Sequence, residues 1–125
     1  MSDKLLPRFT SGTAERADWE AAFAVCWPGP GVDDSDFWKW FELWSARCRR
    51  FKYALDGEFY LNAADLLRPE GWEVSILHHT SNNDGHLGWS VVLNTKRDGH
   101  VVYTGDWAPT EAMARAAAAL RAVQS

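Results

Sequence analysis

The sequence has few cysteines, no long apolar run and no excess of positive charge. Only Cys26 and Cys48 occur, each beside apolar neighbours in a helical pattern. We therefore predict two reduced, buried thiols, with a disulfide as the alternative. No stretch approaches the roughly 18 apolar residues of a membrane span, and residues 1–9 contain no signal-peptide hydrophobic region. These absences lead us to expect a cytoplasmic protein.

The usual motifs of catalysis are also missing. The sequence has no Gly-x-Ser-x-Gly elbow, no glycine-rich phosphate loop and no compact metal-ligand spacing. Adjacent His78 and His79 would point to opposite faces of a strand, so at most one of them serves any given site. A metal site built from His79, His86 and Asp84 across a loop is the alternative. We predict a protein that is not an enzyme, with no catalytic residues, no metal and no cofactor.

The balance of charge disfavours nucleic acid as the main partner. The formal net charge is −4 and the pI is about 5.5. All of the net negative charge falls in residues 55–125, which hold nine acidic and five basic side chains. A polyphosphate would be repelled by such a surface.

The aromatic content is high, and most of it follows helical spacing. The chain contains eight tryptophans. Thr13 can cap a helix that ends at Trp27, before the turn-forming residues 28–31. A second helix, capped by Asp34 or Ser35, would carry the apolar stripe Phe37, Trp40, Phe41, Trp44, Cys48 and Phe51. We predict a helical hairpin over residues 13–53 with these stripes facing a shared core.

Two features of the second helix do not belong to its stripe. Trp38 lies about 100° around the helix from Phe37, so we expect it to be partly exposed. The helix would end with four basic residues that suit its negative dipole end. A phosphate-binding patch is the alternative role for this group, which consists of Arg47, Arg49, Arg50 and Lys52.

The second half of the chain has a mixed pattern. After a linker at residues 54–58, Asn62 can cap a short helix that ends at residues 69–71. Three strands are predicted at residues 72–79, 87–95 and 100–104, and the first of them by the period-two alternation of Trp72, Val74, Ile76 and His78. A long helix over residues 110–123 would place Met113, Ala116, Ala117 and Leu120 close on the sheet. We predict one α+β domain over residues 1–125, in which residues 59–123 form an αβββα sandwich.

Asp98-Gly99 predicts the register of the last two strands. This dipeptide is typical of a type I′ turn. The turn would pair Arg97 with His100, Thr95 with Val102, and Leu93 with Thr104.

The run AADLLRPEGWEVSI and the closing run APTEAMARAAAALRAV support a family resemblance over residues 60–123. This half of the chain resembles the small uncharacterised proteins of tailed phages and prophages grouped as phage α-β-α sandwich domains. The matching residues are Pro69, Glu70, Gly71, Trp72, Ala108, Pro109, Ala118, Leu120, Arg121 and Ala122. The resemblance implies this fold and a phage or mobile-element origin, and it assigns no catalytic residues.

The predicted order of elements is also that of double-stranded RNA-binding domains. Those domains need lysines at the start of the last helix to reach phosphates. Here the corresponding residues 106–111 contain two acidic side chains and no basic one. We therefore predict that the chain is not of this RNA-binding type.

Aromatic residues outside the core pattern indicate a surface for a partner. Trp38 and Trp107 fit no apolar stripe, and tryptophans often dominate interface energetics. With Arg47, Arg49 and Arg50 they form the predicted partner-binding set. We predict a non-enzymatic interaction protein that binds and inhibits a host protein such as a defence nuclease. The alternatives are a homo-oligomer formed through the aromatic hairpin, or a nucleic-acid-binding domain that uses the basic helix end.

Overall fold

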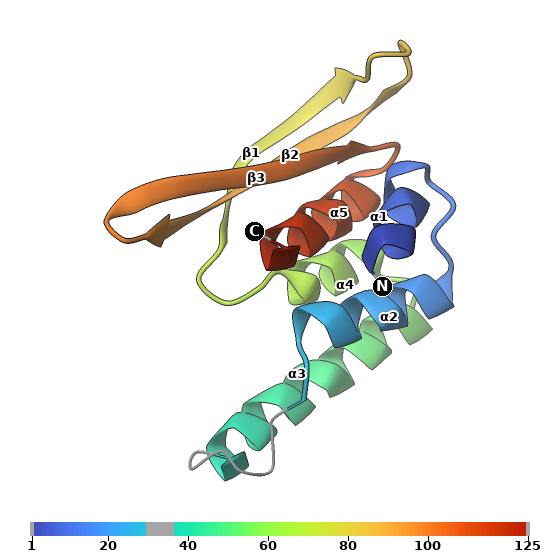
Figure 1. Cartoon of the computed structure of the whole chain (residues 1–125). Helices are drawn as coiled ribbons and strands as arrows, with labels where there is room; N and C mark the ends of the chain where they lie inside the picture. Colours follow the sequence, from blue (N-terminus) through green and yellow to red (C-terminus); the bar gives the residue numbers. More distant parts are fainter. Residues whose placement is uncertain (1, 30–36, 125) are drawn as a thin grey trace.

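The chain folds into several helices packed on one face of an antiparallel sheet (Figure 1). The computed structural model describes residues 2–29 and 37–124. Their elements are α1 Ser2–Thr10, α2 Arg16–Cys26, α3 Phe37–Asp56, α4 Tyr60–Leu67, β1 Glu73–Ser81, β2 Leu87–Arg97, β3 His100–Ala108 and α5 Glu111–Gln124. The predicted α+β class is confirmed. The caps predicted at Asp34 and Ser35 lie outside the described residues.

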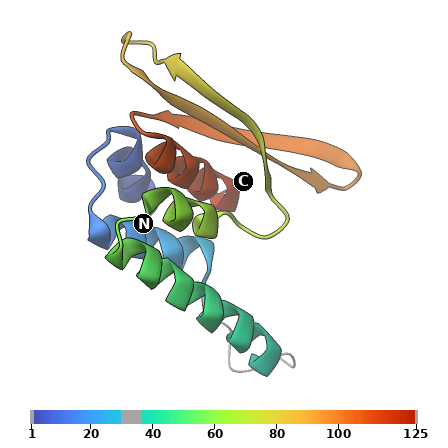
Figure 2. The ribbon, with the colours of Figure 1, turned by 180° about the vertical axis from the view of Figure 1, so that it is seen from behind.

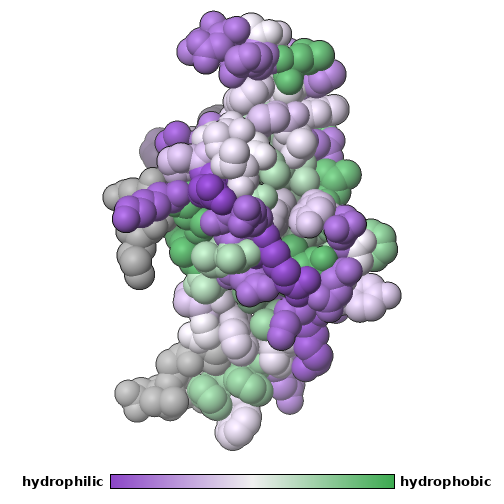
Figure 3. All heavy atoms as spheres, turned by 90° about the vertical axis from the view of Figure 1, so that its right-hand side faces the viewer, coloured by the Kyte–Doolittle hydropathy of each residue, from purple (hydrophilic) through white to green (hydrophobic). Residues whose placement is uncertain are grey.

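The helices form layers on one side of the sheet, whose strand order is β1-β2-β3. Views from the front and from behind agree on this arrangement (Figures 1 and 2). α5 packs on β2 and β3, and α1, α2 and α4 pack on α5. α3 packs on α4, and its start forms the lower tip of the molecule (Figures 1 and 3). No helix within the described ranges has both the length and the apolar character needed to cross a membrane.

The β2–β3 hairpin has the predicted turn and register. Asp98 and Gly99 have φ values of 53° and 79°, and positive φ at both central positions is the signature of a type I′ turn. Leu93 is paired with Thr104 and Thr95 with Val102, as predicted. Val91 and Leu93 are buried against α5 on the face that they share with Val102.

Strand β1 departs from the predicted alternation. A register shift between Val74 and Ile76 places Val74 opposite Leu93 but Ile76 opposite Val92. Val74 and Ile76 therefore lie on opposite faces, and Ile76 is 52% exposed on the face away from α5. The prediction that Trp72, Val74, Ile76 and His78 alternate on one face is wrong because such an irregularity inserts an extra residue.

Helix α5 is buried on two sides rather than one. Ala114, Ala118 and Ala122 belong to the core between α5 and the sheet. Other apolar residues of α5 belong to the core that it forms with the other helices: Ala112, Ala116, Ala117, Ala119 and Leu120. The predicted stripe at Ala116, Ala117 and Leu120 therefore faces the helices and not the sheet. Alanine side chains allow close approach of neighbouring elements on both sides.

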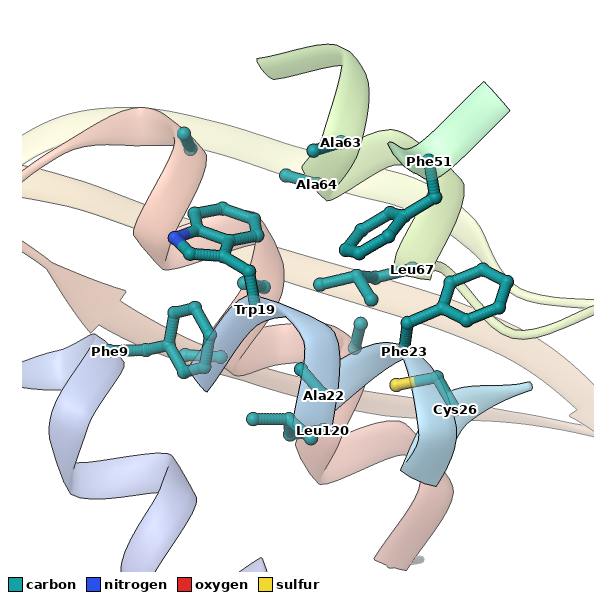
Figure 4. Close-up of a cluster of buried hydrophobic side chains, with 14 of the residues drawn as sticks. Phe9, Trp19, Ala22, Phe23, Cys26, Phe51, Ala63, Ala64, Leu67 and Leu120 are labelled. Carbon is teal, nitrogen blue, oxygen red and sulfur yellow. The ribbon is translucent and has the colours of Figure 1, made fainter. Parts of the chain in front are cut away.

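Helix α1, Ser2–Thr10, was not predicted from the sequence pattern. Its Leu5 and Phe9 are buried, and the Phe9 ring meets Trp19 edge-on at 5.0 Å (Figure 4). α2 begins at Arg16 and not after Thr13. The Asp18 carboxylate accepts a hydrogen bond of 2.8 Å from the Glu15 backbone N–H, which stabilises this helix start.

Candidate functional site

Helix α3 is longer than predicted, and this changes the environment of its basic residues. The helix continues to Asp56, and Ala54 and Leu55, predicted as linker, are helical and buried. Arg47 and Arg50 therefore lie inside the helix rather than at its C-terminal end. The predicted role of these arginines at the negative end of the helix dipole is therefore wrong, because the dipole acts only on side chains in the last turn.

The aromatic stripe of α3 is buried only in part. α2 has 11 residues and α3 has 20, so at 1.5 Å per residue α2 is roughly half as long and does not cover the start of α3. The Phe23 and Phe51 rings stack at 4.7 Å where the helices meet. Phe37 and Phe41, predicted to face the core, lie outside it.

These uncovered rings form a cluster at the start of α3, here called the aromatic ridge and defined as Phe37, Trp38 and Phe41. The Phe37 ring lies 5.1 Å from Trp38 and 5.8 Å from Phe41. Trp38 is 74% exposed, as its position predicted, and Phe41 is 37% exposed. Figure 3 shows hydrophobic side chains at the lower tip of the molecule, over the start of α3.

The next two tryptophans of α3 attach the helix to the body. Trp44 donates an indole hydrogen bond of 2.8 Å to the Trp27 carbonyl. Trp40 stacks on Trp27 at 6.1 Å, and Trp27 in turn donates to the Leu67 carbonyl at 3.2 Å. The boundary between exposed and packed aromatics therefore falls within one turn of α3.

Arg47, a predicted partner-binding residue, holds the end of α4. Its Nε donates to the Leu66 carbonyl at 2.7 Å, and its Nη2 lies 3.4 Å from the Asp65 carbonyl and 3.3 Å from that of Arg68. Its guanidinium carbon lies 3.9 Å from the centre of the Trp27 ring. Burial lowers the pKa of Arg47. This arginine therefore donates to backbone carbonyls at the C-terminal end of α4, where a helix leaves carbonyls without intrahelical partners.

Arg47 also lines a cleft between α3 and the segment that joins α4 to β1. This arginine cleft has a volume of about 370 Å³. Its chemistry comes from three indoles, three guanidinium groups and one carboxylate, contributed by Trp27, Trp40, Trp72, Arg47, Arg50, Arg68 and Glu70. Sequence reasoning missed Arg68, Glu70 and Trp72 as functional candidates because residues 68–72 have the pattern of an ordinary turn.

Arg49 and Arg50 are both exposed, but only Arg50 borders the arginine cleft. Arg50 lines the arginine cleft, and both residues line a groove of about 630 Å³ between α3 and α4, with Tyr53 and Phe59. The basic residues that were predicted as one patch therefore do not form one site. Arg47 contacts the end of α4, and Arg49 lies outside the cleft.

Trp107 lies far from the aromatic ridge, on the sheet face that carries no helix. Its indole N–H donates to the Thr80 carbonyl at 3.0 Å. The ring covers Gly88, where any side chain would collide with it. Trp107 is half-buried and joins β3 to β1 across β2, so the structure does not bring Trp38 and Trp107 together.

The histidines do not converge. His79 stacks on Trp89 at 4.6 Å, whereas His78 is paired with Ser90 and lies on the other face of the sheet. No group of three or more His, Cys, Asp or Glu side chains within residues 2–29 and 37–124 is arranged to hold a metal ion.

No protein family matches this chain, and comparisons with curated proteins and with solved structures found no similar protein. The phage resemblance therefore stays a prediction, and function must be argued from the surfaces of the molecule.

Proposed function

We propose that this protein is a non-catalytic interaction protein of phage or mobile-element origin that binds a partner protein through the aromatic ridge. The observation that carries the proposal is the exposure of Trp38, at 74%, within a cluster of aromatic rings. The ridge residues belong to the start of α3, which extends past α2 (Figure 1), and the high exposure of Trp38 leaves its ring accessible to a partner.

The ridge has the composition of an interface centre. Burying apolar surface contributes roughly 25 cal/mol per Å², and a tryptophan side chain offers a large area at low entropic cost. Two further rings support Trp38 on its own helix, which keeps the indole in a defined position. Such rigid aromatic groups are typical of residues that dominate binding.

Charge next to the ridge favours a basic partner over a second copy of this chain. Three aspartates, Asp33, Asp34 and Asp36, directly precede the ridge in the sequence, and Glu42 follows it, against the single cation Lys39. A homodimer through the ridge would bring two such acidic segments together. A basic surface, such as the nucleic-acid groove of a host defence nuclease, would be attracted instead, and the protein would inhibit it by occupying that surface.

The experiment is capture from nuclease-treated bacterial lysate with the wild-type protein and two variants. Trp38→Ala removes the most exposed ring of the ridge. Tyr53→Ala is the matched control, because Tyr53 is an aromatic residue of the same helix with the same exposure of 74% but lies outside the ridge. We expect one stoichiometric protein with a basic surface, retained by Tyr53→Ala and reduced at least about tenfold by Trp38→Ala.

Three results would contradict the proposal. They are a captured protein that Trp38→Ala still binds fully, the absence of any stoichiometric protein, and a concentration-dependent dimer in light scattering that Trp38→Ala abolishes. The last result would assign the ridge to self-assembly. Equal unfolding midpoints for both variants are required, since Trp38 and Tyr53 are each 74% exposed and neither belongs to the core.

A further inference from the structure

The arginine cleft concentrates positive charge on a protein whose net charge is −4. Arg47, Arg50 and Arg68 line it, and Glu70 is its single acidic residue. Among residues 2–29 and 37–124, no carboxylate lies within ion-pair distance of Arg47 or Arg50. Only Arg68 has such a partner, with Nη2 at 3.2 Å from Asp65 Oδ1. The local charge is therefore incompletely neutralised by the protein itself.

Two of these guanidinium groups are held in place before any ligand arrives. Arg47 is fixed by carbonyl oxygens and by Trp27. Arg68 Nη1 donates to the Trp72 carbonyl at 2.9 Å. Its Nε is buried and has no hydrogen-bond partner. A buried donor without an acceptor is costly, and a charged group without a counterion more so. An anion in the cleft would supply the missing counterion for Arg47 and Arg50, which line it.

The walls of the cleft favour a ligand that is also flat or apolar. Trp27 and Trp40 stack with 22° between their planes, and Trp72 also lines the cleft. Leu43 adds an exposed apolar side chain at 60% exposure. A volume of about 370 Å³ lies near the lower end of small-molecule sites and accommodates about one ring with a short acidic group.

We propose that the arginine cleft binds a small aromatic carboxylate, either free or as the aromatic residue at the C-terminus of a polypeptide. The carboxylate would lie between Arg50 and Arg68, and the ring would pack on Trp40. A singly charged carboxylate fits better than a phosphate, because Glu70 repels the second charge of a phosphate and the acidic protein repels a polyanion.

This site is separate from the aromatic ridge. Arg50 follows Phe41 by nine residues, which is about 180° around the helix at roughly 100° per residue. Arg50 therefore lies on the side of α3 opposite Phe41, and none of the three ridge residues lines the cleft, so the failure of one proposal does not imply the failure of the other.

The test is a titration of the full-length, ¹⁵N-labelled protein with phenylacetate, followed by the Trp40 indole N–H signal assigned with a Trp40→Phe variant. Phenylacetamide, which has the same ring and no charge, is the ligand control. Arg50→Gln removes one cleft guanidinium, and Arg49→Gln is the matched control because Arg49 is also exposed but lies outside the cleft. Both sites are on the surface, so both variants should keep the wild-type spectrum.

We expect saturable shifts at Trp40, binding of phenylacetamide weaker by about tenfold or more, and a similar loss in Arg50→Gln, since a charged hydrogen bond contributes about 1.5–3 kcal/mol. Arg49→Gln should bind like the wild type. A second titration uses a dipeptide that ends in a free phenylalanine carboxylate. If it binds as well as phenylacetate, the natural ligand is the C-terminus of a polypeptide. Weaker binding of the dipeptide identifies the free acid.

The proposal fails if phenylacetate gives no saturable shift at Trp40 up to about 10 mM, which corresponds to an interaction below roughly 3 kcal/mol. It also fails if the amide binds as well as the acid, or if Arg49→Gln and Arg50→Gln weaken binding equally. Displacement of phenylacetate by a lower concentration of inorganic phosphate would reassign the cleft to phosphate.

Discussion

Helix α5 and the start of α3 show opposite relations between residue size and burial. α5 is rich in alanine, yet eight of its residues are buried, six of them with no exposed surface. The first residues of α3 include Phe37, Trp38 and Phe41, none of which is buried. α5 lies between the sheet and three helices, whereas the start of α3 extends past α2. Burial here follows position between layers and not the hydrophobicity of the side chain.

Two tryptophans test this contrast most strongly. Trp19 is 1% exposed and Trp38 is 74% exposed. Trp19→Ala should lower the free energy of unfolding by about 3–5 kcal/mol, the usual cost of removing a buried large aromatic. Trp38→Ala should change it by less than about 0.5 kcal/mol. Urea unfolding followed by circular dichroism measures both, and a large loss in Trp38→Ala would show that the ridge is core. Trp19→Phe, with an intermediate loss, keeps the comparison measurable if Trp19→Ala does not fold.

An enlarged alanine tests the tight packing around α5. Ala117 has no exposed surface and faces the helical layer. Ala117→Leu should destabilise the fold by about 1–3 kcal/mol, because the added atoms have no space. Ala24→Leu, on the exposed side of α2, is the control and should be nearly neutral. Equal midpoints of thermal unfolding for the two variants would mean that the layers around α5 can separate easily.

The two cysteines differ in burial, and this difference should appear in their chemical reactivity more than in the stability of the fold. Both are free thiols, and burial raises the pKa of Cys26 to about 12. Cys48 is half-buried and should be alkylated more than about tenfold faster than Cys26 at pH 8, as peptide mapping would show. Similar rates for both thiols would mean that the helical core opens readily.

The raised pKa of Cys26 also makes the stability of the fold depend on pH. The thiol ionises near pH 9.0 in the unfolded chain and near 12 in the folded one. Its protonated form therefore contributes to stability fully below pH 9, and the contribution is lost as the pH rises towards 12. In Cys26→Ala this part of the alkaline loss of stability should disappear.

Sequence patterns predicted the helices and strands better than they predicted which of these elements pack against each other. The helices at α2, α4 and α5, the three strands and the register around Asp98-Gly99 follow from local signals. α1 was missed because the Pro7 within it and its polar residues obscured the buried pair Leu5 and Phe9. The aromatic ridge was predicted to be core for Phe37 and Phe41 because spacing reports a common helix face but not whether another element covers it. The arginine cleft joins residues more than 40 positions apart, which no local pattern reports.

By itself the sequence determined the features that depend on neighbours along the chain. The type I′ turn follows from two adjacent residues that tolerate positive φ, and helical or extended periodicity follows from the order of apolar side chains. Only the tertiary structure decided which faces are covered. α2 ends at Cys26 and leaves the start of α3 bare, and Arg47 reaches carbonyls about twenty residues further along the chain. Burial and electrostatic pairing act through space, so they are decided only when elements of particular lengths are placed side by side.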